Sequence, residues 1–163
     1  MSVAVLSIGS NLGDRFGHLR AAARLMRDWV IAVSPVYETA PWGPVRQGPY
    51  LNAVLIAADP GAGPRDWLSR AQAVEQAEHR VRERRWGPRT LDVDLIDIDG
   101  ARHNDPQLTL PHPRAAQRAF VLVPWLAVDP RATLPSGPVA ALVDQLPPAQ
   151  LQSVQLRADL VLV

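Results

Sequence analysis

The sequence contains neither cysteine nor lysine, and each absence excludes a class of function. Without cysteine the chain can form no disulfide, no thiolate zinc site and no cysteine nucleophile. Without lysine it cannot build a Walker-type phosphate loop, which places a lysine on the nucleotide phosphates. The glycine fingerprint G-x-G-x-x-G of dinucleotide-binding proteins is missing as well, so any nucleotide must be bound by another arrangement.

Long apolar runs and a strong net charge are also lacking. The apolar run Val3–Ile8 is too short for a secretion signal and no basic segment precedes it, and no apolar stretch is long enough to span a bilayer. The formal net charge is +1, so no overall basic field attracts nucleic acid. We therefore expect a soluble cytoplasmic protein that binds neither nucleic acid nor membranes.

A length of 163 residues is enough for one domain with a sizeable core. The hydrophobic spacing predicts the order strand, helix, strand, strand, helix, strand. The expected strands are Val3–Ile8, Ile31–Tyr37, Tyr50–Ala58 and Thr90–Ile98, and the expected helices are one capped by Asp14, with apolar positions from Phe16 to Val30, and one over Asp66–His79. Two β-α-β units with crossover helices predict a mixed sheet with helices packed on it. The fold class is thus α+β, a ferredoxin-like βαββαβ sandwich with a C-terminal extension, in a single domain over residues 1–163.

The second half of the chain is rich in proline and harder to interpret. Asp99-Gly100 is typical of a β-hairpin turn. Beyond it lie a proline-punctuated stretch, a short apolar segment over Ala119–Leu126, a weak helix over Val139–Gln145 and a terminal apolar strand. Residues after about 130 carry no recognisable motif.

The stretch Arg80–Asp97 concentrates charge of both signs. Asp92 and Asp94 alternate in a strand, so they share a face about 6.5–7 Å apart along the chain. Close carboxylates repel unless something neutralises them, and Mg²⁺ takes one or two carboxylates together with substrate phosphates. The pair therefore predicts a metal site for one or two ions, with a solvated strand face as the alternative. Asp97 is expected on the opposite face, in a structural role.

Arginines precede this strand in a segment bounded by glycine and proline. Planar guanidinium groups suit phosphate oxygens, and metal beside arginine is a recurring arrangement for phosphoryl transfer. The alternative is a solubilising run paired with nearby glutamates. We expect a mobile lid that orders on ligands. The arginines are Arg80, Arg82, Arg84, Arg85 and Arg89.

Three smaller groups carry weaker indications. Tyr50 and Asn52 share a strand face and could stack on a flat heterocycle and read its edge, although ordinary strand packing explains them equally. His112, held between two prolines, could donate to a phosphate or act as a general base, or be structural. Gln72 and Glu75 share a helix face, which is either solvent or a pocket wall.

These residues carry a resemblance to the 6-hydroxymethyl-7,8-dihydropterin pyrophosphokinases of folate biosynthesis. The matching segments occur in the family's order over residues 5 to 130: SIGSNLGDR, YETAPWGP, PYLNAV, RERRWGPRTLDVDLID, LTLPHPR and RAFVLVPWLAVDP. The resemblance implies that ATP and the pterin alcohol give AMP and the pterin diphosphate, the β,γ-diphosphoryl group moving as one unit. It also implies small-molecule partners alone, and we expect a monomer.

The resemblance implies a role for each matched residue. Asp92 and Asp94 would hold two Mg²⁺ ions, with Asp92 also at the substrate, and Arg82 and Arg89 would act catalytically on the phosphates. The ATP site would comprise Gln72, Glu75, Arg82, Trp86, Arg89, Leu95, Thr109, His112 and Arg118. The pterin site would comprise Thr39, Ala40, Pro41, Trp42, Gly43, Tyr50, Asn52 and Phe120.

The chain departs from the family pattern near the lid. It is one residue shorter than some members before Trp86, so Arg84 could take the role of Arg82, and Trp42 and Pro113 replace residues common elsewhere. Two other functions compete with the kinase: an RNA-binding module of RRM type, whose aromatic motif the sequence lacks, and a two-metal phosphohydrolase, which needs more metal ligands. Release of AMP that depends on a pterin alcohol separates the three.

Overall fold

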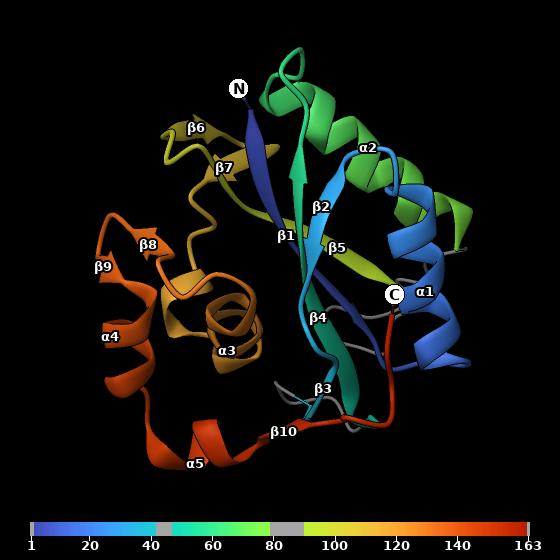
Figure 1. Cartoon of the computed structure of the whole chain (residues 1–163), viewed down its shortest axis with the longest axis vertical. Helices are drawn as coiled ribbons and strands as arrows, with labels where there is room; N and C mark the ends of the chain where they lie inside the picture. The colour runs from blue at the N-terminus through green and yellow to red at the C-terminus, as the bar shows by residue number, and fades with distance from the viewer. Residues whose placement is uncertain (1, 42–46, 79–89, 163) are drawn as a thin grey trace.

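The computed structural model describes residues 2–41, 47–78 and 90–162. A six-stranded sheet runs through its centre, and helices cover both faces of this sheet (Figure 1). Its strands are β1 (Val3–Ser10), β2 (Val30–Val33), β3 (Tyr37–Thr39), β4 (Tyr50–Ala58), β5 (Asp92–Ile98) and β10 (Val154–Leu156). The order is β10-β3-β4-β1-β5, with β2 also paired to β4. The chain is thus an α+β protein, as predicted.

Every strand pair in the described part of the sheet is antiparallel, so the expectation of a mixed sheet was wrong. Strand β4 was predicted at its observed bounds. The predicted strand Ile31–Tyr37 is instead two short strands, β2 and β3, separated by Ser34, Pro35 and Val36. A proline offers no N–H to a strand ladder, which accounts for the break.

One face of the sheet is covered by α1 (Arg15–Leu25) and α2 (Pro64–Ala77). Asp14 caps α1 as predicted, its Oδ1 accepting the N–H of Gly17 at 3.0 Å. Helix α2 begins two residues before the predicted start, because Asp66 lies inside its first turn and accepts the N–H of Gly63 at 2.8 Å. Alternate strand residues such as Leu6, Ile8 and Leu55 pack under these helices in the larger core.

The opposite face is covered by the C-terminal half of the chain. Helices α3 (Ala119–Val128) and α4 (Val139–Asp144) pack on Val5, Val54 and Ile96 in a second core. The apolar segment after residue 118 is therefore a helix, and the weak helix predicted near Val139 is confirmed. The remaining elements are β6 (His103–Asp105), β7 (Leu108–Leu110), η1 (Ala115–Gln117), β8 (Thr133–Leu134), β9 (Gly137–Pro138) and α5 (Pro148–Gln152).

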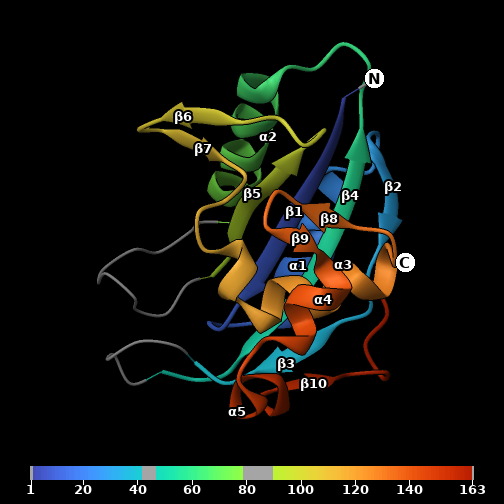
Figure 2. The same ribbon diagram turned by 90° about the vertical axis from the view of Figure 1, so that its left-hand side faces the viewer.

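The turn at Asp99-Gly100 forms, with positive φ angles of 53° and 68°, but it does not close a hairpin. The strand before it, β5, pairs with β1. The hairpin is made by β6 and β7 further along the chain, which project from the body of the molecule in Figure 2. No helix in the described part of the chain is long and apolar enough to cross a membrane.

Candidate functional site

Three neighbouring strands place polar residues in one row across the sheet. In β1, Gly9 pairs with Asn52 of β4 on one side and with Asp92 of β5 on the other. Directly paired residues share a face, and adjacent strands lie about 4.8 Å apart. Asn52 and Asp92 are thus roughly 10 Å apart, with a residue that has no side chain between them. This row is the floor of a pocket.

The pocket collects residues from segments that are far apart in the sequence. Eight of its ten lining residues were predicted as site residues, and the other two are Ser7 and Gly9 of β1. The predicted residues that line it are Thr39, Ala40, Tyr50, Asn52, Asp92, Asp94, Arg118 and Phe120. The sheet therefore brings the predicted pterin residues and the predicted metal ligands into one cavity.

Asn52 is held rigidly at one end of the floor. Its side chain is buried, and its Oδ1 accepts a hydrogen bond of 2.6 Å from the hydroxyl of Thr39, which is also buried. The amide Nδ2 faces Gly9, because a Cβ atom on that glycine would lie only 2.7 Å from it. The two N–H donors on Nδ2 of an amide fixed in this way can bind the edge of a flat heterocycle.

Helix α3 begins at the opposite side of the pocket. Arg118 lies just before its first residue, and its guanidinium carbon is 5.4 Å from the centre of the Phe120 ring. A guanidinium group over an aromatic face is an attractive arrangement. Phe120 from α3 and Tyr50 from β4 give the pocket an aromatic lining from two elements.

Asp92 and Asp94 lie at the other end of the floor, half-buried on β5. They pair with Gly9 and Ser7, two residues of β1 without bulky side chains, so both carboxylates face the pocket. The described residues contain no group of three or more His, Asp and Glu that could form a metal cluster by itself. Two carboxylates suit Mg²⁺ only when substrate phosphates and water complete its shell, and the donor set fits a metal that arrives with a nucleotide.

Asp97 lies on the same sheet face as these two carboxylates, and the prediction of the opposite face was wrong. The register between β1 and β5 shifts, so that Leu6 pairs with Leu95 and Val5 with Asp97. The extra residue, Ile96, is a β-bulge, which restores Asp97 to the face of Asp94. Asp97 is buried, and burial raises the pKa of its carboxyl.

Of the described residues expected around ATP, Arg118 lines this pocket, and the others lie outside it, near β5 and beyond its edge. Glu75 on α2 accepts the N–H of Val93 at 2.9 Å, and Gln72 is exposed on the same helix. The side chain of Leu95 is buried in the core under the helices, so only its backbone can contact a ligand. Thr109 and His112 line a separate open hollow of about 540 Å³ beside the β6–β7 hairpin.

His112 is held as a neutral hydrogen-bond donor. Its Nδ1 accepts the N–H of Arg114 at 3.2 Å, which leaves the ring proton on Nε2. Burial, together with the nearby positive charges of Arg118 and Arg114, lowers the pKa of His112 to about 4. The imidazole is therefore uncharged at neutral pH and a poor base, which argues against its candidate role as general base.

Several predicted site residues lie outside the described residues: Trp42, Gly43, Arg82, Arg84, Trp86 and Arg89. Pro41 is described and exposed, but it does not line the pocket.

Sequence reasoning missed Ser7 and Gly9 as pocket residues, although both stand in the quoted segment SIGSNLGDR. The available indication was the alternation in β1. A serine and a glycine that interrupt an apolar strand mark a close approach of another group, and here that group is the side chain of Asn52.

A larger open hollow of about 910 Å³ lies between α1 and β2. Its lining in the described chain includes the arginines Arg20, Arg24 and Arg27 and none of the predicted site residues. We therefore locate the candidate site in the smaller pocket, where carboxylates, aromatic rings and an amide converge.

Known proteins provide an independent comparison. Residues 5–130 match the model of the family 7,8-dihydro-6-hydroxymethylpterin-pyrophosphokinase (HPPK). The chain is 53% identical to 2-amino-4-hydroxy-6-hydroxymethyldihydropteridine pyrophosphokinase of Mycobacterium tuberculosis, over 96% of this chain and 90% of that protein. The protein of the same name from Methylorubrum extorquens is 37% identical, over 95% of this chain and 100% of the relative.

Solved structures support the fold. The HPPK-DHPS protein of Plasmodium falciparum, crystallised with pterin and p-hydroxybenzoate, superposes with a TM-score of 0.66 at 12% identity. The alignment covers 88% of this chain but only 41% of the Plasmodium chain, which is much longer. The family match over most of the chain and the identity to the curated relatives lead to one conclusion: the chain belongs to the 7,8-dihydro-6-hydroxymethylpterin-pyrophosphokinase family, and it is an ATP-dependent pyrophosphokinase of folate biosynthesis.

Proposed function

We propose that the pocket on β1, β4 and β5 binds the pterin of 6-hydroxymethyl-7,8-dihydropterin, and that Asp92 and Asp94 at its end hold Mg²⁺ on the phosphates of ATP. The observation that carries this proposal is the convergence of eight predicted residues in one cavity. The substrate alcohol would then lie between the fixed amide of Asn52 and the carboxylates, close to the β-phosphorus of ATP, from which its oxygen takes the diphosphoryl group as AMP leaves.

Recognition of the pterin rests on three features of the pocket. The hydrogen bond from Thr39 fixes the amide of Asn52 before any ligand arrives, so little ordering cost is added on binding. Tyr50 and Phe120 supply aromatic faces for a flat ring. Gly9 leaves the floor open between the amide and Asp92.

Asp92 and Asp94 would hold two Mg²⁺ ions together with the phosphate oxygens of ATP and water. This agrees with the donor set, because Mg²⁺ is usually bound by one or two carboxylates and takes its remaining ligands from phosphates and water. Bound metal would neutralise charge that develops on the transferred group. Arg118 lies in the same pocket and would add positive charge on the side of α3. Arg82 and Arg89, which lie outside the described residues, keep the phosphate-binding and catalytic roles implied by the resemblance.

The ATP base and ribose would lie along the free edge of β5. The N–H of Val93 points away from β1 toward Glu75, and alternation in an antiparallel ladder directs the backbone groups of Leu95 the same way. These groups, with Gln72, Glu75 and Thr109, can form the nucleotide site. His112 would donate from Nε2 to a phosphate oxygen, since its Nδ1 already accepts a hydrogen bond.

The sheet order also supports the finer fold assignment. With β2 and β3 taken as one interrupted strand, the order of the four main strands is second, third, first, fourth. This is the order expected for a ferredoxin-like core, here within one domain over residues 1–163. The function we propose requires no second subunit and no membrane, and it suits a monomer in the cytoplasm.

The test is the variant Asp94→Ala, with Asp28→Ala as control because the side chain of Asp28, in the turn after α1, is 82% exposed and does not line the pocket. Pterin-dependent AMP formation in MgATP should fall by roughly 10²-fold or more, on the scale of a lost transition-state charge contact. Pterin binding without ATP, measured by calorimetry, should stay near wild type. Turnover close to that of Asp28→Ala would refute the metal assignment.

A further inference from the structure

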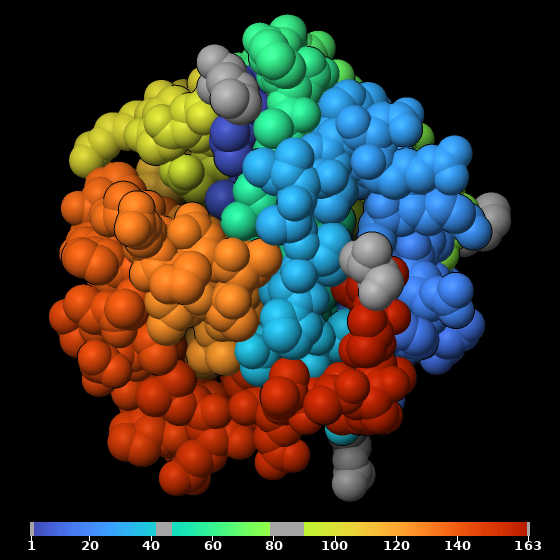
Figure 3. Space-filling view, in the orientation of Figure 1, coloured from blue at the N-terminus to red at the C-terminus, as the bar shows by residue number. Residues whose placement is uncertain are grey.

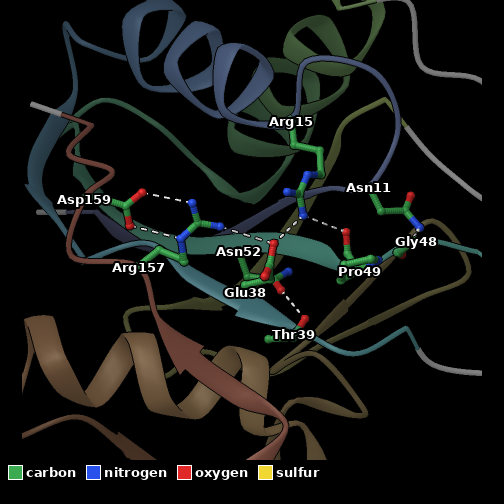
Figure 4. Close-up of polar contacts among 9 residues, drawn as sticks. All are labelled: Asn11, Arg15, Glu38, Thr39, Gly48, Pro49, Asn52, Arg157 and Asp159. Carbon is green, nitrogen blue, oxygen red and sulfur yellow. Dashed lines mark hydrogen bonds and ion pairs between the residues drawn. The ribbon is translucent and has the colours of Figure 1, made fainter.

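Glu38 joins three segments of the chain that are distant in sequence. It lies in β3, and its Oε2 accepts hydrogen bonds from Arg15 at 2.7 Å and from Arg157 at 3.3 Å (Figure 4). Arg15 is the first residue of α1, and Arg157 follows the C-terminal strand β10. All three side chains are about two-thirds buried, with exposed fractions of 31%, 28% and 33%. Charge pairs at this depth are less screened than surface pairs.

This network lies directly behind the pterin pocket. Successive strand residues face opposite sides, so Glu38 is on the reverse face from its neighbour Thr39, which holds Asn52. The same guanidinium nitrogen of Arg15 that binds Glu38 also donates to the carbonyl of Pro49 at 3.1 Å. Pro49 immediately precedes Tyr50. Arg15 therefore fixes both the strand that carries Thr39 and the start of the strand that carries Tyr50 and Asn52.

The C-terminal tail is the third member of the network. Strand β10 pairs with β3, and the N–H of Arg157 donates to the carbonyl of Val36 at 2.8 Å. Asp159 binds the guanidinium of Arg157 through two hydrogen bonds, of 3.0 and 2.9 Å. In Figure 3 the red C-terminal segment lies along the cyan segment of β3. This tail follows the family match, which ends at residue 130.

We propose that Glu38, Arg15 and Arg157 form a positioning network through which the C-terminal tail holds the pterin pocket in its binding geometry. The inference rests on the pterin site proposed above. None of the three residues lines the pocket, so they act through Thr39, Asn52 and Tyr50 rather than on the substrate. Asp159 orients Arg157, because a bidentate carboxylate fixes the plane of the guanidinium.

The network predicts a selective effect on one substrate. The pterin residues Thr39, Tyr50 and Asn52 lie on β3 and β4, which the network contacts. The ATP residues Glu75 and Thr109 lie on α2 and β7, which carry none of the network residues. Loss of Arg157 should therefore loosen the Thr39–Asn52 pair and weaken pterin binding, while ATP binding and turnover at saturation persist. A general loss of stability would affect both substrates.

The experiment compares Arg157→Ala with Arg27→Ala, which removes an arginine whose side chain is 77% exposed. In Arg157→Ala the KM for the pterin should rise roughly fivefold to tenfold, because the pocket loses part of the stabilisation that one charge-assisted hydrogen bond provides. The KM for ATP and kcat should stay within about twofold of wild type. Arg157→Lys should recover part of the affinity, because it keeps the charge and loses the fork. Arg27→Ala should match wild type.

Two further variants separate the possible outcomes. Glu38→Gln keeps the shape of the side chain and should also raise the pterin KM, so it provides the test if Arg157→Ala does not fold. The double variant should have a pterin KM close to that of either single variant, because both substitutions remove the same interaction. Asn52→Ala tests the pocket itself. An unchanged pterin KM in Asn52→Ala overturns the proposed pterin site. A raised KM in Asn52→Ala with unchanged values in folded Arg157→Ala and Glu38→Gln overturns the network.

Discussion

Gly9 offers a direct test of the pocket floor. Its hydrogen occupies the space between Asn52 and Asp92, and a Cβ built there lies 2.7 Å from the Nδ2 of Asn52 and 3.5 Å from the Tyr50 ring. A carbon–nitrogen contact of 2.7 Å is not tolerated, so in Gly9→Ala the amide must move. Asn52 is only 3% exposed, and it cannot move without straining its 2.6 Å hydrogen bond to Thr39.

The cost can be estimated from the two groups that are disturbed. Breaking a buried hydrogen bond costs about 1–3 kcal/mol, and overpacking a rigid site costs about 1–3 kcal/mol. If only the hydrogen-bond part is felt by the ligand, pterin affinity should fall roughly 5-fold to 150-fold, since about 1.4 kcal/mol is tenfold. Both costs together, about 2–6 kcal/mol, should lower the melting temperature by roughly 4–24 °C, at about 2–4 °C per kcal/mol for a chain of this size.

The assay is calorimetric binding of the pterin substrate, in the absence of turnover and well below the melting temperature. Gly61→Ala is the matched control, because the nearest atom to a Cβ at that exposed turn is 3.6 Å away, an ordinary contact. Affinity of Gly9→Ala within twofold of this control would refute the argument that Gly9 keeps the floor open for Asn52 and its ligand.

Two more predictions concern pH and stability. The folded-state pKa of His112 is about 4, below its ordinary value near 6.5, so the unfolded chain binds the extra proton first as the pH falls. The free energy of unfolding should therefore decrease between about pH 6.5 and about pH 4. Urea titrations over a range of pH should show that this pH dependence is smaller in His112→Gln than in wild type within that window and equal in the two proteins above pH 7. The guanidinium carbon of Arg70 lies 4.0 Å from the centre of the Trp29 ring and 4.8 Å from that of Trp67, and the group donates to Asp59 at 2.7 Å. Arg70→Ala should therefore lower the free energy of unfolding by roughly 2–4 kcal/mol in urea titrations, with both KM values unchanged, and a loss below about 0.5 kcal/mol would contradict the stacking argument.

The sequence predicted those parts of the molecule that depend on local spacing. Strand β4, the two helices under it and the shared face of Asp92 and Asp94 all follow from hydrophobic alternation. Eight of the predicted site residues also line one pocket, because β1, β4 and β5 pair side by side and place their polar residues in one row.

The failures arose where pairing between distant segments decides the outcome. The face of Asp97 depends on a bulge opposite Val5 and Leu6, and a bulge is a property of two strands rather than one. The turn at Asp99 has the dihedral angles of a hairpin, but β5 is already paired with β1, so the following chain leaves the sheet. The network around Glu38 joins residues more than 100 positions apart, which no local pattern predicts.

The position of the pocket follows from how the second face of the sheet is covered. Along β1, β4 and β5 this face is apolar at Val5, Val54 and Ile96, where α3 and α4 pack on it. Toward the other end the same face changes to Ser7, Gly9, Asn52, Asp92 and Asp94. Helix α3 begins at this boundary, with Arg118 and Phe120 turned to the polar side. The site is therefore the part of a continuous sheet face that the C-terminal helices leave uncovered.

Strand β10 follows those helices and pairs with β3, the strand that carries Thr39. The C-terminal segment thus shapes the pocket twice, through the wall made by α3 and through Arg157 behind β3.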